Sequence, residues 1–418
     1  MGIGYACLTI GVQDTKLKSC TAKKANDEVL RELILNNLNS LKNIIEYNIS
    51  NEIKLFRISS DLIPFASSPI NTISWAEIFK NELKEIGNKI KDSGMRVSMH
   101  PGQYTVLNSE DGEVVERAIC DLNYHTMLLD SLGLSSENKI ILHIGGVYDD
   151  KKQAIKRFIA NYKKLSDSVK NRLVIENDDK CYNISEVLEI SKELKIPVVF
   201  DVLHNKANPS SIDESEISWI KKSGNTWKEK DGIQKIHYSQ QDNLKRAGAH
   251  SASISINQFM KFYETLPEYS IDIMLEVKDK NISAVKCNNC IKKDKDSKAI
   301  EIEWSKYKYK ILENSQSDYE EIEKLLENKN EYNCVAFYNL IEQGLKKEST
   351  KEQFLDTVSR IFEIVEVHLM EKEKGRFTKN IQSFNQGIIA KSKIKNNLWR
   401  LAIQYNVEEL LGSYFFII

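Results

Sequence analysis

The sequence predicts an α/β protein, in which a (β/α)8 barrel of the TIM type is followed by a small all-α domain. Short apolar segments rich in Val, Ile and Leu alternate with longer amphipathic segments up to about residue 285. The apolar segments lack regular polar alternation, which is typical of parallel strands buried on both faces. Eight strand–helix units within about 280 residues match the length and rhythm of a (β/α)8 barrel.

Each predicted strand is a short run of aliphatic residues. The eight strands are Ile3–Ile10, Lys54–Ile58, Met95–Met99, Lys139–Ile144, Leu173–Ile175, Pro197–Phe200, Gln234–Ile236 and Asp272–Leu275. Segments between them place apolar residues three and four apart, as helices packed on one face do. These predicted helices are Asn26–Tyr47, Trp75–Asp92, Val114–Leu132, Lys151–Leu165, Ser185–Leu194 and Ile256–Leu266. A doubly wound sheet would begin with a glycine-rich dinucleotide-binding turn, which the sequence lacks.

The character of the sequence changes after residue 285. We expect a barrel over residues 1–285, a lysine-rich linker over 286–301 and a helical C-terminal domain of unknown role over 302–418. The helices predicted in this domain are Ile302–Leu312, Asp318–Asn328, Asn333–Leu345, Lys351–Glu371 and Ile394–Tyr405. The Lys and Arg residues dispersed over them are interpreted as a solvated surface.

Composition narrows the class of protein. The 59 Lys and Arg residues nearly balance the 60 Asp and Glu residues, so a polyanionic partner would require a local basic patch or bound metal. Seven scattered cysteines indicate a reducing compartment rather than a disulfide framework. With no signal-peptide pattern and no apolar run long enough to span a bilayer, we expect a cytoplasmic protein without a membrane partner.

Acidic and histidine residues follow six successive predicted strands, at the end where the active sites of barrel enzymes lie. These residues are His100, His143, Glu176, Asp201, His204, His237, His250 and Glu276. They include five of the seven histidines, whereas His125 and His368 are interpreted as ordinary helix residues. Mixed imidazole and carboxylate ligands suit Zn²⁺ or Mn²⁺ better than Mg²⁺ or Ca²⁺. Eight ligands exceed the needs of one ion, so we expect two or three metals bridged by carboxylates such as Glu176, an arrangement typical of phosphodiester hydrolysis.

With these motifs assembled, the sequence resembles the ultraviolet damage endonucleases, which are relatives of endonuclease IV. The resemblance covers about residues 1–285 and includes ordered motifs that begin at Gly4-Tyr5-Ala6-Cys7, Phe56-Arg57-Ile58-Ser59-Ser60-Asp61, His100-Pro101-Gly102-Gln103, His143-Ile144-Gly145-Gly146, Glu176-Asn177-Asp178-Asp179-Lys180, Lys235-Ile236-His237-Tyr238-Ser239 and Leu275-Glu276-Val277-Lys278. The C-terminal helices lie outside it and look like a helical domain of unknown function.

The resemblance implies a trinuclear site formed by the eight residues above, with Mn²⁺ favoured and Zn²⁺ or Mg²⁺ as alternatives. Catalytic roles fall on Glu176, Lys235, His237 and Glu276. The resemblance also implies that Lys235 is carboxylated; a plain lysine paired with Glu176 or Asp201 is the alternative. Enzymes of this family nick damaged duplex DNA immediately 5′ to pyrimidine dimers and 6-4 photoproducts, leaving a 3′-hydroxyl and a 5′-phosphate, and often cut abasic sites. We therefore expect a monomer that associates with the nucleoid during repair and needs no protein partner.

The resemblance assigns DNA contacts as well. Gln103 and Tyr104 match the pair that the family inserts opposite the lesion, and an amide with an aromatic ring can fill a gap in the base stack. Tyr5 is expected to contact the lesion or backbone, although Leu8-Thr9 departs from the family's neighbouring polar position. That departure leaves the lesion preference open. Candidate phosphate contacts, with structural ion pairing as the alternative, are Arg57, Lys180, Lys206 and Lys278.

Several alternatives stay open at this point. A sugar isomerase-like barrel metalloenzyme would also place His, Glu and Asp at strand ends, but it would have little use for the Gln103-Tyr104 loop. An abasic-site endonuclease without photoproduct specificity is the second rival, and a non-catalytic DNA-binding protein is the third. Cys287 and Cys290 resemble half a zinc site, but without a second pair nearby two reduced thiols are the simpler interpretation.

Overall fold

In the computed structural model, which describes residues 2–211, 213–292, 297–327 and 333–418, eight parallel strands close into a barrel. Each strand pairs with its neighbours in chain order, and the eighth pairs back with the first. The strands are β1 (Ile3–Ala6), β2 (Leu55–Ile58), β3 (Arg96–Met99), β4 (Ile140–His143), β5 (Leu173–Glu176), β6 (Val198–Asp201), β7 (Lys235–Tyr238) and β8 (Asp272–Leu275). The predicted fold class is thereby confirmed.

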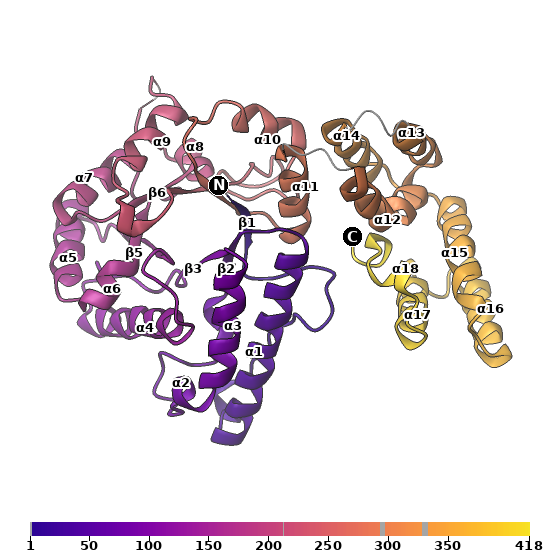
Figure 1. Cartoon of the computed structure of the whole chain (residues 1–418), viewed down its shortest axis with the longest axis horizontal. Coiled ribbons are helices and arrows are strands. Elements are labelled where there is room, and N and C mark those ends of the chain that lie inside the picture. The colour runs from indigo at the N-terminus through magenta and orange to yellow at the C-terminus, as the bar shows by residue number, and fades with distance from the viewer. Residues whose placement is uncertain (1, 212, 293–296, 328–332) are drawn as a thin grey trace. The chain divides into compact units, whose positions relative to one another are not determined.

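The helices that alternate with these strands lie outside the barrel (Figure 1). They are α1 (Asp27–Ser50), α2 (Trp75–Ile78), α3 (Lys80–Asp92), α4 (Gly112–Ser131), α5 (Lys151–Lys163), α6 (Asp167–Arg172), α7 (Ile184–Leu194), α8 (Val202–Ala207), α9 (Glu216–Gly224), α10 (Ile256–Tyr263) and α11 (Asn281–Ile291). Short 3-10 turns are η1 (Ala22–Lys24), η2 (Ser60–Leu62) and η3 (Glu229–Asp231).

Almost every strand residue is buried, in agreement with the apolar pattern of the sequence. Close packing of β1 on β2 requires a glycine at position 4, because a Cβ there would lie 1.8 Å from the carbonyl oxygen of Leu55. Two predicted elements differ in the structure, one ending earlier and the other dividing. The first strand stops at Ala6 rather than Ile10, because Cys7 adopts a left-handed backbone with φ of 69°. The single helix predicted over Trp75–Asp92 is two helices that meet at Phe79.

The chain divides into two units, Met1–Ile254 with Lys261–Asn288 and Ser255–Met260 with Asn289–Ile418. The predicted linker over 286–301 is too long, since α11 continues to Ile291 and the next helix already begins at Ser297. Residues 293–296 lie outside the described residues, as does Asn328 at the end of one predicted helix. None of the helices in the described part of the chain is long and apolar enough to cross a membrane.

The second unit is helical, as the sequence predicts. Its helices are α12 (Ser297–Asn314), α13 (Gln316–Glu327), α14 (Cys334–Leu345), α15 (Lys351–Glu366), α16 (Glu371–Asn385), α17 (Lys391–Gln404) and α18 (Glu408–Leu411), followed by the 3-10 turn η4 (Tyr414–Phe416). The sequence does not predict α16, because its stretch is strongly polar and buries only Phe377 and Phe384. This helix is stabilised by tertiary packing and not by an amphipathic sequence pattern, since Phe377 stacks on Phe362 of α15 with ring centroids 4.2 Å apart.

Candidate functional site

The predicted acidic and histidine residues come together at the C-terminal end of the barrel. His143 ends β4, Glu176 ends β5 and Asp201 ends β6, while His100 and Glu276 directly follow β3 and β8. Strand register sets neighbours side by side, because His143 pairs with Glu176 and Asp201 pairs with His237. The parallel barrel therefore delivers these side chains to one layer, as the order of motifs in the sequence predicts.

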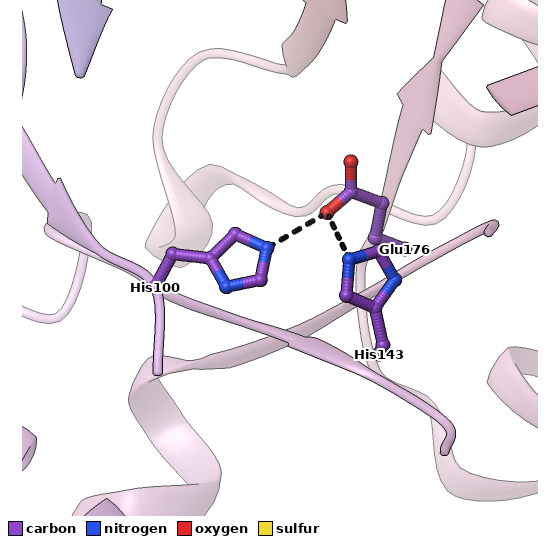
Figure 2. Close-up of side chains that lie close together, drawn as sticks. All are labelled: His100, His143 and Glu176. Atoms are coloured by element: carbon purple, nitrogen blue, oxygen red, sulfur yellow. Dashed lines mark hydrogen bonds and ion pairs between the residues drawn. The ribbon is translucent and has the colours of Figure 1, made fainter. Parts of the chain in front are cut away.

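Glu176 is the centre of the cluster. One of its carboxylate oxygens, Oε2, lies 3.2 Å from Nε2 of His100 and 3.6 Å from Nε2 of His143. Figure 2 shows the two imidazoles turned toward this same oxygen from different strands. Its other oxygen, Oε1, lies 2.5 Å from Nδ1 of His237. A single buried carboxylate is thus shared by three imidazoles.

Two overlapping groups have the composition and spacing to hold metal ions. The first is His100, His143 and Glu176, and the second is Glu176, Asp201, His237 and Glu276; within each group the ligand atoms all lie within 4.8 Å of one another. Glu176 belongs to both groups, which is the geometry expected of a bridging carboxylate.

The two remaining predicted ligands lie at the edge of these groups. Nδ1 of His204 is 3.8 Å from Asp201 and 3.9 Å from Glu176. Nε2 of His250 is 3.8 Å from Glu276, and its ring lies 6.2 Å from that of His204. All eight residues singled out in the sequence are therefore in one cluster.

The electrostatics of the cluster favour a bound cation. Burial, together with the nearby Glu276 and Asp201 carboxylates, raises the pKa of Glu176 well above its usual range. Burial also lowers the pKa of His100 to about 4, and burial together with Arg57 holds the pKa of His237 well below its usual range. Neutral imidazoles keep a lone pair for a metal, and a cation would relieve the repulsion among the crowded carboxylates.

Unsatisfied buried atoms give an independent test of whether metal ions fit this site. Among the described residues, Oδ2 of Asp201 and Nδ1 of His143 are buried without a hydrogen-bond partner. Buried polar atoms normally have partners, so such orphans at a cluster of ligands indicate a missing group. The donor set, imidazole nitrogen with carboxylate oxygen, fits Zn²⁺ or Mn²⁺.

Lys235 lies below this layer, two residues before His237 on β7. Its side chain is fully buried, and its Nζ has no hydrogen-bond partner. Burial, assisted by Arg96, lowers the pKa of this amine well below its usual range. The ion pair with Glu176 or Asp201 that the sequence left open is not formed among the described residues.

The predicted lesion-probing residues lie on the loop that begins at His100. Gly102, Gln103 and Tyr104 are exposed, and Tyr104 keeps 82% of its surface accessible. The rings and amides of this tip are therefore accessible to a bound molecule.

The predicted phosphate contacts divide into two kinds. Lys180 is exposed at the rim, whereas the exposed Lys206 and Lys278 form ion pairs with Glu216 and Asp242 at 3.2 and 3.3 Å. For these two lysines the structure shows the ion pairing that the sequence analysis kept as an alternative.

Two residues predicted to contact DNA are placed elsewhere. Tyr5 has no exposed surface, and its hydroxyl is bonded to Thr9 and Asn48. Arg57 is buried within the cluster, where its Nη2 donates to Oε1 of Glu276 at 2.5 Å. The two side chains are buried on opposite faces of the sheet: Tyr5, in register with Phe56, points outward and bonds Asn48 of α1, whereas Arg57, in register with Ala6, points into the barrel. Arg57 acts instead on the charge of the cluster, keeping the pKa of Glu276 well below its usual range despite burial.

The cysteines do not form a metal site in the described part of the chain. The groups there that can hold a metal contain only histidine and carboxylate residues. Cys290 lies with its Sγ 3.2 Å from that of Cys334, a partner that the sequence gave no reason to expect. Cys287 and Cys290 are both free cysteines in the structure.

Sequence reasoning missed three polar residues beside the probing loop: Ser60, Asp121 and His125. Asp121 and His125 stand four residues apart on α4, so they share one helix face. His125 lies inside this helix, as the sequence predicts, and its ring is fully buried with polar contacts on both sides.

Known proteins support the assignment of this barrel. Residues 1–305 match the family described as UV-endonuclease UvdE, and residues 308–418 match a protein family of unknown function, DUF1722. The chain is 44% identical to the UV DNA damage endonuclease of Clostridium perfringens (strain 13 / Type A), over 91% of this chain and 92% of that protein. It is 33% identical to the UV DNA damage endonuclease of Bacillus cereus (strain Q1), over 63% of this chain and 83% of that protein.

A solved structure agrees with these relatives. The crystal structure of SacUVDE is 40% identical and matches with a TM-score of 0.65, covering 69% of this chain and 96% of that one. The fold, the barrel sequence and the ordered motifs thus point the same way, and the chain belongs to the UV-endonuclease UvdE family.

Proposed function

We propose that this chain is a repair endonuclease that hydrolyses DNA immediately 5′ to ultraviolet photoproducts, and also at abasic sites, leaving a 3′-hydroxyl and a 5′-phosphate. The observation that carries the proposal is the clustering of eight imidazole and carboxylate side chains, with Glu176 at the centre, beside an exposed loop. Its membership of the UvdE family makes it a DNA endonuclease and leaves the sugar isomerase-like and non-catalytic alternatives without support.

The proposed ligands are His100, His143, Glu176, Asp201, His204, His237, His250 and Glu276, holding two or three divalent ions, with Mn²⁺ favoured. When bound, such ions supply a hydroxide nucleophile and stabilise the leaving oxygen and the charge on phosphorus. Among the chain's own residues, Glu176 links the two groups of ligands. Arg57 holds Glu276 ionised, so that its carboxylate is ready to accept a cation.

Lys235 is proposed to carry a carboxyl group. Its neutral amine attacks CO2, forms the N–C bond of a carbamate and releases one proton, which leaves a carboxylate near His237. The support is a fully buried Nζ without a partner and a lowered pKa. Native mass spectrometry under non-acidic conditions should show the chain heavier by one CO2, and Lys235→Met should abolish that increment. A plain chain mass in the native protein would reject the modification.

Recognition is proposed to depend on Gln103 and Tyr104. An exposed aromatic ring and an amide can occupy the space that opens when damaged bases leave the stack. Lys180 is proposed to contact a phosphate, because it is exposed at the rim of the same end of the barrel. Gln103→Ala/Tyr104→Ala should lose lesion selectivity while keeping its metal content, which elemental analysis can measure.

One assay tests the proposal. The protein is treated with a chelator, reloaded separately with Mn²⁺, Zn²⁺ or Mg²⁺, and incubated with an end-labelled duplex that carries a single pyrimidine dimer. We expect no cleavage after chelation and a nick on the 5′ side after reloading with Mn²⁺. A second duplex with a single abasic site is the matched substrate. Cleavage of the abasic duplex alone would favour an abasic-site endonuclease, and cleavage of neither would refute the proposal.

A further inference from the structure

The loop that carries the probing residues also carries a metal ligand. Residues 100–105 follow β3, with His100 at the start, and the exposed tip Gly102-Gln103-Tyr104 stands between buried Pro101 and buried Thr105. A short exposed tip without regular structure can adopt many conformations. A side chain that must enter a base stack, however, has to be held in one or a few of them. The protein therefore requires a means of holding both ends of this loop.

The distal end is tied to α4 by Asp121. The hydroxyl of Thr105 donates to Oδ2 of Asp121 at 2.6 Å, and the amide of Thr105 donates to the carbonyl of Gly102 at 2.9 Å, closing the turn beneath the tip. The other oxygen of Asp121, Oδ1, accepts from the exposed Ser67 at 3.0 Å, a contact that lies outside residues 100–105.

The proximal end is tied to the same helix by His125, one turn further along. The hydroxyl of Ser60 lies between this ring and the loop, 2.9 Å from Nε2 of His125 and 2.8 Å from the carbonyl oxygen of His100. On the other side of the ring, Nδ1 lies 2.6 Å from the carbonyl of Asp121. The ring is fully buried, so this chain of contacts is shielded from water.

We propose that Asp121 and His125 are positioning residues, which clamp the probing loop to one face of α4 and so fix Tyr104 relative to the ligand His100. This inference rests on the proposed function, in which Gln103 and Tyr104 probe the duplex. Two anchors one helical turn apart hold the two ends of a six-residue loop, so the tip reaches the DNA at a set distance from the metal cluster. Neither residue touches the substrate.

The test loosens one anchor without removing volume. Thr105→Val deletes the hydroxyl bonded to Asp121, Thr105→Ser keeps it, and Ser67→Ala removes the other bond to the same carboxylate without touching the loop. Cleavage of the pyrimidine-dimer duplex is measured for each variant as kcat and KM. We expect Thr105→Val to lose about tenfold in kcat/KM, the worth of one positioned contact, with unchanged metal content. Thr105→Ser should restore the value, and Ser67→Ala should stay within about twofold of wild type.

A double-mutant cycle separates positioning from a general structural role. In a Tyr104→Ala background the clamp has no probe left to position, so Thr105→Val should cost little more than Tyr104→Ala alone. A full additional tenfold loss in that background would overturn the proposal. Ser60→Ala tests the second anchor in the same way and should also be non-additive with Tyr104→Ala.

Failure of the clamp is distinguishable from failure of the proposed function. If the wild type nicks the dimer duplex but Thr105→Val and Ser60→Ala match it, the loop is positioned by other contacts and the inference is wrong. If Tyr104→Ala itself matches the wild type, the tip has no probing role and the clamp proposal also fails. Absence of nicking by the wild type would refute the proposed function, and the inference with it.

Discussion

Both ends of the barrel bury charged side chains, but they arrange these charges differently. At the N-terminal end, Lys139 and Asp231 form a buried pair at 2.6 Å, and Arg96 meets Asp272 at 2.7 Å. Each charge there has one opposite charge. At the C-terminal end three carboxylates crowd together, with Arg57 as their cationic neighbour.

The difference separates structural charges from functional ones. A buried pair of opposite charges is already neutral and needs nothing further, so it contributes to the fold and is damaged only when one partner is removed. A crowded group of carboxylates and neutral imidazoles is stable only with an added cation. Buried charge alone does not identify a site, whereas uncompensated buried charge does.

The largest expected effect is at the crowded end. Glu176→Gln removes the carboxylate shared by both groups of proposed ligands, so cleavage of the dimer duplex should fall at least about 10³-fold. Because the substitution also removes a repelled buried charge, the metal-free variant should unfold at no lower temperature than the wild type. Glu193→Gln, at an exposed ion pair with Lys163, is the matched control. Near-normal cleavage by Glu176→Gln would contradict the functional role assigned to the crowded C-terminal end.

The paired end should respond in the opposite sense. Lys139→Met leaves Asp231 buried without its partner, which should lower the free energy of unfolding by about 3–5 kcal/mol. Activity of the folded fraction at low temperature should change little. Chemical denaturation measures the first quantity and the nicking assay the second. Adding Asp231→Leu to Lys139→Met should recover part of the lost free energy of unfolding. A loss of activity at unchanged stability would show that this end of the barrel also takes part in catalysis.

Acid should destabilise the metal-free protein through the imidazoles of the crowded end. The pKa of His100 is about 4 in the folded protein and 6.5 without its environment. Between these pH values the imidazole of His100 is protonated in the unfolded chain but not in the folded one. The free energy of unfolding therefore falls as the pH falls from about 6.5 to 4. The loss approaches about 3 kcal/mol. Denaturation at several pH values measures it, and His100→Gln should flatten the profile; an unchanged slope would contradict the assignment.

The smallest effect concerns exposed lysines. Lys180→Gln should weaken DNA binding a few-fold and reduce the salt dependence by about one counterion, because it removes one phosphate contact. Lys54, at the other end of the barrel, donates to the carbonyl of Ser93 and should tolerate the same change without effect. Equal losses from both substitutions, measured by fluorescence anisotropy over a range of salt concentrations, would mean that DNA is held by overall charge and not at the rim.

Much of this protein could be predicted from its sequence. Fully buried parallel strands leave a continuous apolar signal, so seven of the eight strands were placed to within about two residues. The clustering of the candidate ligands could be predicted because a closed parallel barrel brings the ends of all its strands to one rim. Helix α16 escaped prediction, because its stability depends on packing of Phe377 and not on local pattern.

The sequence by itself determined the barrel and the identity of the eight clustered side chains, since both follow from the order of strands along the chain. Only the tertiary structure decided which way individual side chains point and what surrounds them. It buried Tyr5 against α1 and Arg57 within the cluster, left Nζ of Lys235 without a hydrogen-bond partner among the described residues, and joined Asp121 and His125 to a loop about 20 residues earlier in the chain. Such contacts join residues that are far apart in the sequence. The burial and the charge state of each side chain depend on all its neighbours in space, which the local sequence does not specify.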